Sequence, residues 1–223
     1  AVEPGHIHAI IGPNGAGKTT LVNQLTGDTR PDSGRIVFQS EEITHLKVHR
    51  RARLGMARSF QITHIFENLT VAENMALSIC AHHGHNFRFW KKGLQSPVVK
   101  QKLNQALTTF DLAHRAGMPA SSLSHGEKRQ LEVGMALTGD PSLLILDEPM
   151  AGLGPGGTVE LSKLIRKLKG SLTLLLVEHD MDVVFSLADM ITVLVHGENI
   201  LTATPEMVRH DPRVQAAYLG EDE

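Results

Sequence analysis

This sequence has a single cysteine, a small net charge and no long apolar run. Its single cysteine, Cys80, excludes an internal disulfide and favours a reducing compartment. No apolar run approaches the roughly 18 residues that a membrane-spanning helix needs, and no signal peptide is recognisable. A net charge of −2 over 223 residues argues against a nucleic-acid-binding surface. These absences predict a cytoplasmic protein whose attachment to a membrane, if any, comes through partners.

The most informative motif is the stretch GPNGAGKT at residues 12–19, which fits the phosphate-binding pattern G-x-x-x-x-G-K-[ST]. The residues from His6 to Ile11 predict a buried strand before this loop, and Lys18 to Leu25 predict a helix after it. A loop so placed aims backbone N–H groups and the positive end of the helix at one point. We therefore predict that it binds the phosphates of ATP, with Lys18 at the β- and γ-phosphates and the Thr19 hydroxyl on Mg²⁺. The predicted contacts are Gly12, Pro13, Asn14, Gly15, Ala16, Gly17, Lys18, Thr19 and Thr20.

A second motif is an apolar run from Leu143 to Leu146 that ends in Asp147 and Glu148. An all-apolar strand is typical of the buried centre of a parallel sheet, and its carboxyl end is where such sheets place ligands. We predict that Asp147 holds Mg²⁺ through water and that Glu148 orients and polarises the attacking water. The alternative is an ordinary strand that ends in a solvated acidic turn, and the phosphate-binding loop upstream disfavours it.

Between these motifs, the stretch Leu123-Ser124-His125-Gly126-Glu127 precedes an amphipathic helix. Ser124 with Glu127 three residues later predicts a capping box at the helix start. The stretch also resembles the LSGGQ-type signature of ATP-binding-cassette (ABC) proteins, with His125 in place of the usual glycine. In that family this helix start contacts the γ-phosphate bound by a second subunit. The resemblance therefore implies a head-to-tail pair of ATPase subunits, of identical or different chains, in which Ser124, His125, Gly126 and Glu127 act in trans.

Other positions resemble further motifs of the same family. Gln61 stands where the family has a glutamine that touches magnesium and senses the transmembrane partner, and His179 matches the histidine that hydrogen-bonds the γ-phosphate. Gly154 stands where many members have an aspartate, so signalling by that carboxylate is not expected here. The resemblance thus implies a set of catalytic residues and a set of Mg²⁺ ligands. The catalytic residues are Glu148, His179, Lys18 and Gln61, and the Mg²⁺ ligands are Thr19, Gln61 and Asp147.

The family also implies an α/β fold, with a P-loop ATPase core built on a mainly parallel sheet flanked by helices. We expect this core at residues 1–61 and 139–223 and a helical subdomain at 62–138. Family members usually carry a longer N-terminal segment with an antiparallel strand and an adenine-stacking aromatic residue, so we expect this region to be truncated here. We interpret the basic stretch 47–53 as a solvated helix face and the histidine cluster 82–85 as a loop without a metal.

Several stretches, among them 57–61, 148–153, 177–181 and 204–206, resemble the ATPase subunits of branched-chain amino-acid importers. This implies permease subunits in the membrane, an indirect link to a substrate-binding protein, and a location on the inner face of the prokaryotic plasma membrane. A permease helix could dock on Ile65, Phe66, Asn68, Leu69 and Val71, unless these residues only pack in the core. The alternatives are a urea or amide importer, a lipopolysaccharide exporter, a soluble ABC ATPase, and a nucleotide-binding regulator without turnover, against which Glu148 argues.

Overall fold

A computed structural model describes residues 1–59, 65–82 and 96–219. The chain divides into two compact units. The first unit comprises Ala1–Arg58, Ser142–Pro149 and Ile165–Glu223, and the second comprises Ser59–Pro141 and Met150–Leu164. Among the described residues, none of the helices combines the length and the apolar character that crossing a bilayer requires.

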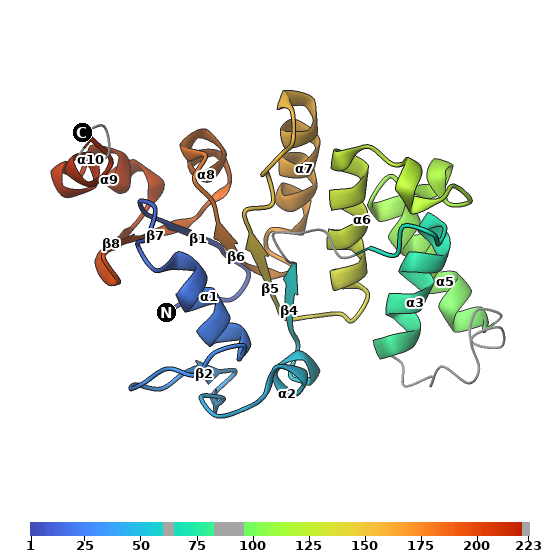
Figure 1. Cartoon of the computed structure of the whole chain (residues 1–223), viewed down its shortest axis with the longest axis horizontal. Coiled ribbons are helices and arrows are strands. Elements are labelled where there is room, and N and C mark those ends of the chain that lie inside the picture. Colours follow the sequence, from blue (N-terminus) through green and yellow to red (C-terminus); the bar gives the residue numbers. More distant parts are fainter. Residues whose placement is uncertain (60–64, 83–95, 220–223) are drawn as a thin grey trace. The chain divides into compact units, whose positions relative to one another are not determined.

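A six-stranded sheet is the framework of the first unit (Figure 1). The strands lie in the order β4-β5-β6-β1-β7-β8. Strands β5, β6, β1 and β7 are parallel, whereas β8 closes the edge by running antiparallel to β7. This arrangement confirms the predicted α/β fold with a mainly parallel sheet. The strands are β1 (Ile7–Ile11), β4 (Met56–Ser59), β5 (Leu143–Asp147), β6 (Thr173–Val177), β7 (Met190–Val195) and β8 (Glu198–Ala203).

Helices cover this sheet because its central strands are apolar on both faces. Helix α1 (Lys18–Thr26) packs through Val22 against Ile10, Ile145 and Leu175 of the sheet. Helix α8 (Met181–Leu187) lies on the opposite side of the sheet from α1 (Figure 1). The remaining elements are the hairpin β2 (Val37–Phe38) and β3 (Glu41–Glu42), and helices α2 (Val48–Arg53), α7 (Pro155–Leu168), α9 (Pro205–His210) and α10 (Pro212–Leu219). The boundary between the two units falls within α7.

Helix α2 corrects one interpretation of the basic stretch 47–53. Arg50 and Arg53 are exposed as predicted, but Arg51 retains only 2% of its accessible surface. Its guanidinium donates hydrogen bonds to the carbonyl oxygens of Gln24 and Leu25, both at 2.6 Å, at the end of α1. Helix carbonyls at that end have no partner within their own helix, so a buried cation that binds them is stabilising.

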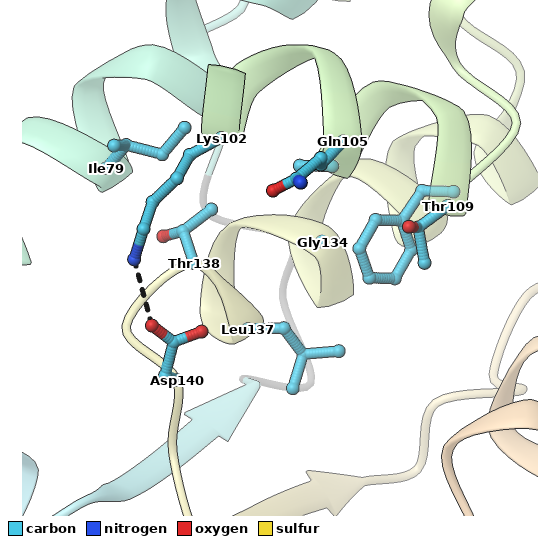
Figure 2. Close-up of a pocket in the computed structure, with 10 residues that line it drawn as sticks. Ile79, Lys102, Gln105, Thr109, Gly134, Leu137, Thr138 and Asp140 are labelled. Atoms are coloured by element: carbon cyan, nitrogen blue, oxygen red, sulfur yellow. Dashed lines mark hydrogen bonds and ion pairs between the residues drawn. The ribbon is translucent and has the colours of Figure 1, made fainter. Parts of the chain in front are cut away.

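The second unit consists mainly of three packed helices, α3 (Val71–His82), α5 (Pro97–Thr109) and α6 (His125–Leu137). Short 3₁₀ turns at Ala113–Arg115 and Ala120–Ser122 connect α5 to α6. A Cβ atom on Gly134 would lie 2.7 Å from the terminal methyl of Met75 and 3.0 Å from the Phe110 ring, so a larger residue there would require these side chains to shift. A cavity of about 170 Å³ lies beside Gly134, and the ion pair between Lys102 and Asp140, 2.9 Å long, lies on its wall (Figure 2).

The proposed permease-docking residues differ in exposure. Phe66 and Asn68 are exposed, whereas Ile65 and Leu69 are half-buried. Val71 is fully buried at the start of α3, so of the two alternatives core packing accounts for it. Of the histidine cluster, His82 ends α3 and the rest lies outside the described residues.

Candidate active site

The predicted catalytic segments leave the sheet from neighbouring strand ends. Strand β6 pairs with β1, where Val177 lies beside Ile10, and with β5, where Val177 lies beside Asp147. Neighbouring strands are about 4.8 Å apart, so the carboxyl ends of β1 and β5 lie about 10 Å from each other. The phosphate-binding loop follows β1, Glu148 follows β5 and His179 follows β6. The sheet therefore brings these three segments to a single edge.

The phosphate-binding loop needs glycine for two reasons, lack of space for a side chain at one position and backbone conformation at two others. A Cβ atom on Gly12 would lie 2.1 Å from the carbonyl oxygen of Leu194. Gly15 and Gly17 have φ angles of 75° and 95°, in the left-handed region that glycine adopts without strain. Gly17 also precedes the first turn of α1 and, having no side chain, does not cap that turn itself. Its backbone N–H groups can therefore donate to an anion.

Lys18 lies over this loop rather than in solvent. Its Nζ donates hydrogen bonds to the carbonyl oxygens of Gly12 at 2.5 Å and Pro13 at 3.0 Å, and the residue is 9% exposed. An ammonium group has three donors, so it can bind these carbonyls and also donate to a phosphate. Thr19 and Thr20 follow it in the first turn of α1 and are both exposed.

The two carboxylates after β5 have different surroundings. Asp147 is 5% exposed, and its Oδ2 accepts a hydrogen bond of 2.9 Å from Arg58 Nη2. Glu148 has a φ angle of 46°, which is uncommon for a residue other than glycine, and its N–H donates to the carbonyl oxygen of Val177 at 2.9 Å. Backbone strain of this kind persists where surrounding structure holds it, and it is common at active sites. The strained turn redirects the chain immediately after the buried strand.

The side chain of His179 is largely exposed, with 66% of its surface accessible. Its neighbour Glu178 is buried, and Glu178 Oε2 accepts a hydrogen bond of 3.2 Å from the His179 N–H. The His179 ring is farther from this carboxylate, with Nδ1 at 3.9 Å. Asp180 then caps α8 by accepting from the N–H groups of Asp182 and Val183. The imidazole is therefore presented outward from a firmly held backbone.

The signature stretch lies in the second unit, and its start is the predicted capping box. Ser124 Oγ accepts from the Glu127 N–H at 3.3 Å, and Glu127 Oε2 accepts from the Ser124 N–H at 2.8 Å. Arg115 Nε donates to the other oxygen of Glu127 at 2.8 Å. Burial raises the pKa of Glu127, but the hydrogen bonds from Ser124 and Arg115 outweigh it and hold this pKa below its ordinary value. His125 is exposed and Gly126 is half-buried.

Two residues remain, Gln61 from the predicted set of site residues and Arg58, which is outside that set. Gln61 lies outside the described residues. Arg58 was not predicted as a site residue, although it is the partner of Asp147. Its only sequence signal is a charged residue in a short strand, because its partners lie 30 or more positions away along the chain.

The oxygen donors at this edge fit Mg²⁺ bound together with a nucleotide. Mg²⁺ prefers oxygen ligands, keeps several waters and takes one or two protein groups plus phosphate oxygens. The Thr19 hydroxyl and the Asp147 carboxylate are donors of this kind. No cluster of three or more histidine, cysteine, aspartate or glutamate side chains among residues 1–59, 65–82 and 96–219 could hold a metal by itself. The fit therefore depends on phosphate oxygens.

Comparison with known proteins identifies the family to which this chain belongs. Residues 1–151 match the family model described as ABC transporter, and residues 198–223 match the model described as branched-chain amino acid ATP-binding cassette transporter. The high-affinity branched-chain amino acid transport ATP-binding protein BraF of Pseudomonas aeruginosa is 39% identical, over 99% of this chain and 89% of BraF. The corresponding protein LivG of Escherichia coli K12 is 37% identical, over 98% of this chain and 88% of LivG.

A solved structure shows the same fold. The ADP conformation of MJ1267, an ATP-binding cassette of an ABC transporter, superposes with a TM-score of 0.84 at 30% identity and covers 98% of this chain and 89% of that one. The chain is therefore a member of the ABC transporter family of ATP-binding, ATP-hydrolysing subunits.

Proposed function

We propose that this protein is the ATP-hydrolysing subunit of a membrane importer for branched-chain or similar amino acids. The ATPase part of the proposal is supported by the register of Ile10, Val177 and Asp147 across the sheet, since the phosphate-binding loop, Glu148 and His179 follow these neighbouring strand ends. The match of residues 198–223 to the branched-chain amino acid model supports this cargo over the urea, amide and lipopolysaccharide alternatives.

The reaction is phosphoryl transfer from ATP to water, in which positioning and charge stabilisation supply most of the catalysis. The N–H groups at the start of α1 bind the phosphates, and Lys18 donates to the β- and γ-phosphates. Thr19 and Asp147, with Gln61, would hold Mg²⁺, and the bound ion would offset negative charge on the phosphates. The water oxygen bonds to the γ-phosphorus as the bond from phosphorus to the leaving ADP oxygen breaks, and Glu148 accepts a proton from that water. His179 donates a hydrogen bond to the γ-phosphate.

The proposed assembly has two cassettes, two permease subunits and a separate substrate-binding protein, on the cytoplasmic face of a prokaryotic plasma membrane. Ser124, His125, Gly126 and Glu127 contact the ATP held by the second cassette, because the start of a helix is an anion site. The helix α6 has 13 residues, and Ser124 leaves part of its first turn free for such a contact. The exposed Phe66 and Asn68 remain candidates for permease contact.

Replacing Glu148 tests the hydrolytic role. We expect Glu148→Gln to slow ATP hydrolysis by about 10²- to 10⁴-fold, because an amide cannot accept the proton of the water. ATP affinity should be retained, since the phosphate contacts come from other residues, and a nucleotide-bound dimer should accumulate. Phosphate release and size-exclusion chromatography with ATP measure the two effects. Near-normal turnover in this variant would remove Glu148 from its role.

Replacing Lys18 tests the binding role separately. Lys18→Ala should weaken ATP binding by about 10-fold or more, because a charge-assisted hydrogen bond contributes roughly 1.5–3 kcal/mol. Fluorescence anisotropy of a labelled ATP analogue measures this affinity, and Lys163→Ala is a matched control because its ion pair with Glu160 is exposed. Equal affinity in the two variants would contradict the role of the phosphate-binding loop.

The importer itself is tested by co-expression with candidate permease subunits from the same organism. We expect the chain to co-purify with them and, in proteoliposomes, its ATPase rate to rise when the binding protein carries leucine, isoleucine or valine. Stimulation by urea, an amide or lipopolysaccharide instead would replace the proposed cargo. Turnover that no permease affects would favour a soluble ABC ATPase.

A further inference from the structure

Arg58 connects three segments of the first unit through one buried guanidinium. Its Nη2 donates to Asp147 Oδ2 at 2.9 Å. Its Nη1 donates to Asn23 Oδ1 at 2.8 Å and to Asp28 Oδ2 at 3.0 Å, with Thr26 Oγ1 at 3.4 Å. The contacts therefore join the end of β5 to the last turn of α1 and the loop after it.

The burial of these groups makes the pairing with Asp147 the important one. The side chains of Arg58 and Asp147 are 12% and 6% exposed, whereas that of Asp28 is 39% exposed. Two opposite charges attract more strongly where water is excluded, and removal of one partner leaves the other buried without compensation. The exposed pair with Asp28 is screened by solvent. The buried contact thus determines where the Asp147 carboxylate lies.

Arg58 is itself held in place, which lets it act as a fixed support. Asn23 accepts from the same nitrogen as Asp28, and Thr26 Oγ1 donates to Asp28 Oδ2 at 2.7 Å. Asn23 lies about one helical turn after Thr19 on α1. The guanidinium consequently joins the helix that carries Thr19 to the strand that carries Asp147, the two described residues that we assign to Mg²⁺.

We propose that Arg58 is a positioning residue for the magnesium site: it holds Asp147 by one carboxylate oxygen and fixes its placement relative to Thr19. This inference rests on the proposed function. Residues that orient a metal ligand without touching the metal typically change metal affinity by about 10- to 100-fold when they are replaced. If Arg58 instead competed with the metal for Asp147, its removal would strengthen metal binding, so the two ideas predict opposite signs.

The test compares metal binding with metal-free nucleotide binding in Arg58→Met. Mn²⁺ replaces Mg²⁺ because its free form has an electron paramagnetic resonance signal, and the protein is first saturated with ADP. We expect the Mn²⁺ dissociation constant of the ADP complex to rise by about 10-fold or more. Affinity for a fluorescent ATP analogue in EDTA should match that of the unmodified protein, because Lys18 and the N–H groups of the loop are unchanged.

Two further variants keep the test decisive. Arg53→Met removes an exposed arginine of α2 and should leave both affinities unchanged. Arg58→Lys keeps the charge, but a single ammonium cannot replace the planar fork that reaches Asp147 and Asn23 together, so an intermediate loss of Mn²⁺ affinity is expected. If Arg58→Met fails to fold, shown by circular dichroism, the lysine variant decides.

The outcomes separate this inference from the proposed function. Unchanged or tighter Mn²⁺ binding in the Arg58 variants would overturn the positioning role and leave the ATPase proposal standing. An equal loss of nucleotide affinity with and without metal would also overturn it, since Arg58 would then support only the phosphate-binding loop. An unmodified protein that binds neither nucleotide nor Mn²⁺ would refute the proposed function, and the role of Arg58 with it.

Discussion

Replacement of the buried Arg51 should destabilise the first unit strongly. Four of its hydrogen bonds go to backbone carbonyl oxygens: Nη1 to Gln24 and Leu25 at 2.6 Å, Nε to Leu46 at 2.9 Å, and Nη2 to Thr44 at 3.0 Å. Arg51→Met keeps an apolar stem of similar length but removes every donor. The carbonyls at the end of α1 would then lose their partners.

The magnitude follows from the number of carbonyls left without a donor. A buried acceptor that loses its hydrogen bond costs about 1–3 kcal/mol, and water can reach some of these sites once the guanidinium is gone. We therefore expect a loss of about 3–5 kcal/mol in the free energy of unfolding, similar to breaking other buried charged contacts. Since whole proteins are stable by only about 5–15 kcal/mol, the effect should be evident at room temperature.

Urea unfolding followed by circular dichroism at 222 nm measures the loss. The matched control is Arg50→Met, which removes the neighbouring but exposed arginine and should change stability by no more than about 0.5 kcal/mol. If the two variants unfolded at the same urea concentration, the carbonyl contacts of Arg51 would not contribute to stability, and our account of the end of α1 would be wrong.

Two more predictions concern the second unit. Cys80 is buried in α3, and burial raises the pKa of its thiol. It should therefore react with a thiol reagent such as dithionitrobenzoate only at the rate at which this unit opens. Labelling in native buffer as rapid as labelling in urea would contradict the burial of Cys80. The pKa of Glu127 is lowered in the folded protein, so its carboxylate stabilises the capping box above its ordinary pKa, and this contribution is lost as the pH falls through the lowered value. The stability difference between the unmodified protein and Glu127→Gln, measured by urea unfolding, should therefore be largest at about pH 7 and shrink as the pH falls below about 4.3, the ordinary pKa of glutamate. A difference that did not depend on pH would show that Arg115 and Ser124 do not need the charge.

Features whose interacting residues are neighbours along the chain could be predicted from the amino-acid sequence. The loop at 12–19, the apolar strand that ends in Asp147 and Glu148, and the Ser124–Glu127 capping box each lie within a few residues, so their patterns predict their geometry. The alternation of apolar strands with helices likewise predicted a mainly parallel sheet, because βαβ connections bury both faces of such strands.

The roles of residues whose partners are distant in sequence became clear from the folded structure. Arg51 and Arg58 look alike as isolated cations, yet one binds helix carbonyls 26 and 27 positions away and the other binds Asp147 across 89 positions. Val71 has an apolar side chain that suits a docking surface as well as a core. Its complete burial in the folded protein shows that it packs in the core. A local pattern specifies local hydrogen bonds, whereas burial and long-range ion pairs depend on which segments the fold brings together.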